Sequence, residues 1–124
     1  MQSLSVVLLQ SDAGLAQSLT ASLSTTFHNV RIAGSLDELR HTVARQRADV
    51  VVVDMEVASA SHVRAITEEF PGIVVVCNHR LADESMWITA LEAGAADFCP
   101  SSDGTGILQA AARGARPFAS AMTA

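Results

Sequence analysis

The most constraining feature of this sequence is a run of four valines, Val50 to Val53, that ends in the carboxylate Asp54. A continuous apolar run is typical of a strand buried on both faces of a parallel sheet, because a half-exposed strand alternates apolar and polar residues. In such α/β folds the functional side chains lie at the carboxyl ends of the strands. The run therefore predicts that Asp54 lies at the functional edge of a parallel sheet.

Strand-like apolar segments alternate with segments of helical periodicity five times. The expected strands are 5–9, 29–33, 50–53, 73–77 and 96–99, and the helical segments include 15–23, 35–43, 63–70, 83–93 and 107–113. Asp12 or Ser11 can cap the first helix, and Ser35 with Glu38 forms a capping-box pattern for the second. This alternation predicts a parallel sheet with helices on both faces.

Composition excludes several functional classes. With 124 residues the chain is long enough for one domain with one core. All eight basic residues are arginine, and the net charge of −5 is spread without blocks, so we expect no direct contact with nucleic acid and none with an anionic membrane. No apolar run is long enough to span a bilayer, and the start of the sequence lacks the basic region of a signal peptide, so a cytoplasmic location is expected.

The two cysteines, Cys77 and Cys99, are too few for a disulfide framework and have no partner at metal-ligand spacing. Free cysteine usually behaves as a small buried apolar residue. We expect two buried thiols at the ends of neighbouring strands, with a redox pair as the alternative.

Two stretches resemble the receiver domain of bacterial response regulators. Residues 49–54 are similar to the strand that carries the phosphoacceptor aspartate, and residues 90–98 are similar to the segment that joins the fourth helix to the fifth strand. The resemblance covers residues 5–114. It implies a flavodoxin-like (βα)5 doubly wound domain with strand order 2-1-3-4-5, occupying residues 1–116, with 117–124 as the start of a linker or tail.

In that family a histidine kinase phosphorylates the aspartate, which here falls at Asp54. Two acidic residues after the first strand hold Mg²⁺, a Ser or Thr follows the fourth strand, and a lysine follows the fifth. These groups are needed because a phosphoryl group that moves onto a carboxylate must have its charge neutralised. This sequence contains no lysine at all.

The other pocket positions of the family have also changed. The acidic pair is replaced by Gln10 and Ser11, the hydroxyl position falls at Asn78 or His79, and the lysine position falls at Ser101. The resemblance therefore implies an atypical receiver that keeps the phosphoacceptor position and lacks the groups around it.

We accordingly predict a phosphorylation-independent protein-interaction and dimerisation module with no enzymatic activity and no cofactor. One alternative is a receiver phosphorylated on Asp54, with a kinase supplying the missing charge and Asp12, Asp54 and Glu56 as a weak Mg²⁺ site. A second alternative is a phosphatase similar to the haloacid dehalogenases, because two carboxylates, Asp54 and Glu56, lie two residues apart.

A protein partner, an output domain or a second copy of the chain is expected to bind the face formed by helix 83–93, strand 96–99 and helix 107–113, a common contact face of receivers. Three consecutive bulky apolar residues in the first of these helices cannot all face the core. The candidates for this interface are Met86, Trp87, Ile88 and Ile107, and Phe98 falls at the position of the family's switch aromatic residue.

Overall fold

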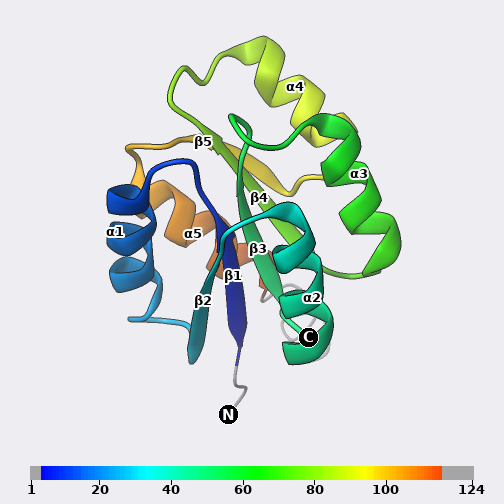
Figure 1. Ribbon diagram of the computed structural model, residues 1–124. Helices are drawn as coiled ribbons and strands as arrows, with labels where there is room; N and C mark the ends of the chain where they lie inside the picture. Colours follow the sequence, from blue (N-terminus) through cyan, green and yellow to red (C-terminus); the bar gives the residue numbers. More distant parts are fainter. Residues whose placement is uncertain (1–3, 116–124) are drawn as a thin grey trace, which may run out of the picture.

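The computed structural model describes residues 4–115, which form a five-stranded parallel sheet covered by helices on both faces (Figure 1). The strands are β1 (Ser5–Leu9), β2 (Asn29–Ala33), β3 (Val50–Asp54), β4 (Val74–His79) and β5 (Asp97–Pro100), in the order β2-β1-β3-β4-β5. The helices are α1 (Ala13–Leu23), α2 (Leu36–Gln46), α3 (Ala60–Glu69), α4 (Glu84–Glu92) and α5 (Gly104–Ala115). The predicted flavodoxin-like arrangement and strand order are confirmed.

Several elements extend beyond the ranges that the sequence indicated, among them β4 and α5. β4 continues past Cys77 to His79, because its last two residues pair in register with Asp54 of β3 and with Pro100 of β5. α5 begins at Gly104, where the carboxylate of Asp103 accepts a hydrogen bond from the amide of Gly106 (2.9 Å) and so satisfies a free donor at the helix start. The predicted boundary between 116 and 117 lies outside the described residues.

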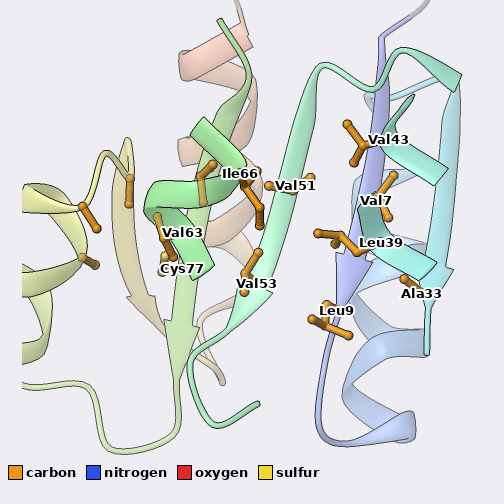
Figure 2. Close-up of a cluster of buried hydrophobic side chains, with 14 of the residues drawn as sticks. Val7, Leu9, Ala33, Leu39, Val43, Val51, Val53, Val63, Ile66 and Cys77 are labelled. Atoms are coloured by element: carbon orange, nitrogen blue, oxygen red, sulfur yellow. The ribbon is translucent and has the colours of Figure 1, made fainter. Parts of the chain in front are cut away.

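The sheet separates two apolar layers, since successive strand residues point to opposite faces. On one face, α2, α3 and α4 cover Val51 and Val53 of β3 together with Val7 and Leu9 of β1. Figure 2 shows this layer, with side chains of α2 and α3 packed over the central strands. On the other face, α1 and α5 cover the alternate residues of the same strands. All four valines of β3 are fully buried, as the apolar run predicts.

The helix starts follow the capping signals in part. Asp12, and not Ser11, caps α1, with its carboxylate accepting from the amide of Gly14 (3.0 Å). The hydroxyl of Ser35 caps α2, but the carboxylate of Glu38 accepts from the amide of Gly34 (3.1 Å), so the reciprocal half of the predicted capping box is wrong. Among residues 4–115, no helix combines the length and the apolar run that a bilayer crossing requires.

Both cysteines are buried and free, as expected. They lie on opposite faces of the sheet, since Cys77 packs in the layer under α2, α3 and α4, and Cys99 packs in the layer under α1 and α5. Burial raises the pKa of Cys77 from its ordinary value of 9.0 to about 12, and burial likewise raises the pKa of Cys99 to about 11. The redox pair is therefore not formed, and both thiols stay protonated at neutral pH.

Candidate functional site

Four polar side chains gather at the carboxyl edge of the sheet because of strand alternation. Each lies two positions after an apolar residue that faces α1 and α5, so its side chain points to the same face of the sheet. These apolar residues are Leu8, Val52, Val76 and Cys99. The four are Gln10 after β1, Asp54 of β3, Asn78 of β4 and Ser101 after β5. The register places Asp54 beside Asn78 and Asn78 beside Cys99, so neighbouring strands bring these side chains together.

Asp54 is completely buried, and both of its carboxylate oxygens accept hydrogen bonds. Oδ2 accepts from the amide (2.9 Å) and from the hydroxyl (2.6 Å) of Ser11. Oδ1 accepts from the amide of Glu56 (2.9 Å). Hydrogen bonds to a charged acceptor are stronger than those between neutral groups, so these three donors stabilise a buried carboxylate without a cation.

Beside Asp54 the other three side chains form a neutral hydrogen-bonded network. Gln10 and Asn78 form a reciprocal amide pair, with each donating from its nitrogen to the other's oxygen at 2.9 Å. Asn78 also donates to the hydroxyl of Ser101 at 2.8 Å. In the described part of the chain every buried polar side-chain atom has a partner, so this network is fully satisfied.

The rim of the pocket carries the nearest cation, Arg80. Its guanidinium is exposed and binds both carboxylate oxygens of Glu56, at 2.8–3.0 Å. This hydrogen bond and the charge of Glu56 raise the pKa of Arg80, and the charges of Asp54 and Asp12 add smaller contributions. Arg80 is thus close enough to Asp54 and Asp12 to feel their charges, but its hydrogen bonds are to Glu56. Local sequence patterns do not indicate this pair, because it joins loops 24 residues apart.

The Mg²⁺ that the resemblance implies does not fit these residues. Of the weak candidate set, Asp12 caps α1, Glu56 binds Arg80, and both oxygens of Asp54 are occupied by donors. Within residues 4–115 no three His, Cys, Asp or Glu side chains are grouped in a way that could hold a metal ion. Glu56, the second carboxylate of the phosphatase alternative, is bonded to the exposed guanidinium of Arg80.

The two candidates for the hydroxyl position are placed differently. Asn78 lies in the buried network, whereas His79 is half-buried and its Nδ1 accepts from the amide of Leu81 (2.9 Å). Only the backbone carbonyl of His79 contacts the pocket, by accepting from the amide of Ser101 (3.1 Å). Phe98, at the position of the switch aromatic residue, is buried in the layer under α4.

The interface candidates divide into exposed and buried residues. Trp87 is 43% exposed and Ile88 45% exposed on the outer face of α4, while Met86 is partly buried against the core. Ile107 is fully buried between α5 and the sheet, so its assignment to an interface is wrong: its position in the periodicity of α5 faces it inward. The sequence analysis missed Leu81, which precedes α4 and is 74% exposed. Its exposure could have been predicted, because Leu81 is a single bulky apolar residue in a loop.

No protein-family model matches the sequence, and no curated protein matches it. Solved structures do match over nearly the whole chain. A response regulator from Thermotoga maritima shares 23% sequence identity at a TM-score of 0.83, covering 92% of this chain and 98% of that one. An atypical orphan response regulator shares 20% identity at a TM-score of 0.81, covering 92% and 97%.

The chain has the receiver fold. NtrX from Brucella abortus contains the same fold within a longer protein, with 15% identity and a TM-score of 0.85, covering 98% of this chain and 28% of NtrX. Within this fold, the pocket of the present chain has an aspartate at the end of β3, and the polar residues around it are Ser11, Gln10, Asn78 and Ser101.

Proposed function

We propose that this chain is an atypical receiver domain of a bacterial cytoplasmic regulator, and that it acts through protein contacts without phosphorylation of Asp54. The observation that carries the proposal is the hydrogen bonding of the pocket. Both oxygens of Asp54 are bonded to donors from the chain itself, and the neighbouring space holds the neutral network of Gln10, Asn78 and Ser101.

The charge balance of the pocket supports this proposal. Transfer of a phosphoryl group to Asp54 would add negative charge at a fully buried position, where uncompensated charge is costly. The guanidinium of Arg80, which lies at the rim of the pocket, is bonded to Glu56. A phosphoryl group attached through Oδ2 would displace the donors of Ser11, and Arg80 could neutralise it only by leaving Glu56. Residues 4–115 contain no group of three His, Cys, Asp or Glu side chains that could hold a metal ion and offset these losses.

A structural neighbour makes the proposal reasonable. The structure of the atypical orphan response regulator described above is reported to reveal a phosphorylation-independent regulatory mechanism. At 20% identity the two chains share a fold, and the pocket residues of this chain supply the separate argument given above.

The experiment is to incubate the purified chain with acetyl phosphate and Mg²⁺, quench rapidly and record the intact mass. We expect no adduct. The matched control is the variant Gln10→Asp, Ser11→Asp, Ser101→Lys, which restores the charges that the family uses. Adding Asp54→Asn to this variant tests whether any adduct is on Asp54.

A conventional receiver domain in the same run verifies the phosphodonor, so the result for the natural sequence is decisive even if the restored variant does not fold. Circular dichroism of each variant checks folding. An adduct on Asp54 of the natural sequence would overturn the proposal and favour phosphorylation with charge supplied by a kinase.

The contact surface that we propose is the exposed apolar face of α4, formed by Trp87, Ile88 and the preceding Leu81, and its occupant is a second copy of the chain. Sedimentation equilibrium is expected to show a dimer that Trp87→Glu dissociates. Ile32→Glu is the control, because Ile32 is equally exposed (47%) but lies on β2 at the other edge of the sheet. A chain that remains monomeric at high concentration would refute the dimer, and a Trp87→Glu variant that remains dimeric would refute the surface.

A further inference from the structure

A second hollow lies at the amino-terminal edge of the sheet, at the opposite end of the strands from Asp54. It is a groove of about 840 Å³ between the ends of α2, α3 and α5 and the start of β4. Its walls include Val43 and Ala44 of α2, Phe70 and Pro71 after α3, Val74 of β4 and Ala115 at the end of α5.

The lining of the groove is mainly apolar. Its charged residues are Arg47 and Asp49, and the carboxylate of Asp49 already accepts a hydrogen bond from the amide of Ser5 (2.8 Å). The volume lies within the range of roughly 300–1,000 Å³ that is common for ligand pockets. A hollow with apolar walls binds an apolar group, because occupation removes both surfaces from water.

The chain itself leads into this groove. Ala115, the last described residue of α5, is part of the groove wall. The end of α5 is held close to β4 at Gly114, where a Cβ atom would come within 2.5 Å of a methyl group of Val74. Close packing therefore fixes the last described turn of α5 beside the groove.

The sequence after Ala115 supplies an apolar side chain within reach. Phe118 is the third residue after Ala115, and three residues span at most about 10 Å when extended. Pro117 in the sequence disfavours helical backbone at the residue before it. Phe118 is also the largest apolar side chain between residues 116 and 124.

We propose that residues 116–124 dock in the groove, with Phe118 as the anchor. The segment is then held against α2, α3 and β4 by side-chain contacts, whereas from the sequence we expect residues 117–124 to be the start of a linker or tail. The proposal is independent of the phosphorylation chemistry of Asp54, because the groove and the pocket lie at opposite ends of the strands.

The test uses the full chain and two readouts, the amide chemical shifts of Gly72, Ile73 and Val74 and the midpoint of thermal unfolding. Phe118→Ser is expected to move these shifts and to lower the midpoint by about 4 °C or more. Met122→Ser, which removes an apolar side chain four residues further along, is expected to have a much smaller effect. An equal response to the two substitutions would overturn Phe118 as the anchor.

A substitution on the groove wall makes the test reciprocal. Ala44→Glu places a charge in the groove at an exposed position of α2, and Ala21→Glu makes the same change on the exposed face of α1 as a folding control. If the segment docks, Phe118→Ser has little further effect once Ala44→Glu is present. Unchanged shifts and midpoint in Phe118→Ser would overturn the proposal. Shifts in the natural sequence that depend on protein concentration and persist in Phe118→Ser would also overturn it, in favour of a second copy.

Discussion

Alkaline conditions should destabilise this protein through its two cysteines. The sequence contains no lysine and no tyrosine, so Cys77 and Cys99 are its side chains with an ordinary pKa between about 8 and 12. Both thiols are buried in the native state, where burial raises the pKa of Cys77 to about 12 and that of Cys99 to about 11. In the unfolded chain both return to the ordinary value of 9.0.

The direction in which pH changes the free energy of unfolding depends on which state, native or unfolded, binds more protons. Above pH 9 the unfolded chain releases both thiol protons, whereas the native state retains them up to pH 11–12, so rising pH favours unfolding. One pKa unit corresponds to about 1.4 kcal/mol, so between pH 7.5 and 10.5 each thiol lowers the free energy of unfolding by about 2 kcal/mol. The two together reduce the free energy of unfolding by about 4 kcal/mol, out of the roughly 5–15 kcal/mol that is usual for a domain.

The assay is urea denaturation followed by circular dichroism at pH 7.5, 9 and 10.5 under a reducing, oxygen-free atmosphere. The control is the double variant Cys77→Ala, Cys99→Ala, which is less stable at neutral pH because it leaves small cavities, but which should lose the decrease with pH. A natural sequence whose free energy of unfolding stays constant to pH 10.5, or a double variant that retains the decrease, would refute the reasoning.

Two further substitutions test packing that the structure identifies. Asn78→Ala removes the partner of the buried Ser101 and of the partly buried Gln10, and it should lower the free energy of unfolding by about 3 kcal/mol. Asn29→Ala, at a partly exposed amide pair, should cost less than about 1 kcal/mol, and equal losses in urea titrations would contradict the network around Asn78. Gly114→Ala brings a methyl group against Val74 and should lower the free energy of unfolding by about 1–3 kcal/mol. In the control Gly104→Ala the new methyl group meets nothing within 4 Å, so this variant should be as stable as the natural sequence or slightly more stable. A Gly114→Ala variant with an unchanged thermal midpoint would show that α5 is not held at this position.

The fold could be predicted from the sequence because its signals are local. The valine run of β3, the leucine repeat of α1 and the capping serine of α2 each depend on residues a few positions apart. Exposure was harder to predict. Three adjacent residues of α4 differ in burial, and this difference depends on how α4 lies on the sheet.

The pocket, too, could be predicted from the sequence only in part. Its positions could be named from the sequence, but the choice between Asn78 and His79 could not be made, because a shift of one residue in a strand moves a side chain to the opposite face. The register with β3 places Asn78 beside Asp54. The pairing of Arg80 with Glu56 likewise joins two loops that only the folded sheet brings together.

The sequence by itself determined the alternation of strands and helices, the buried aspartate at the end of β3, and the absence of lysine, because these are properties of residue type and spacing. Tertiary structure decided which polar side chains meet around that aspartate and which apolar ones face solvent, because such contacts join residues far apart in the chain and depend on strand register and helix orientation.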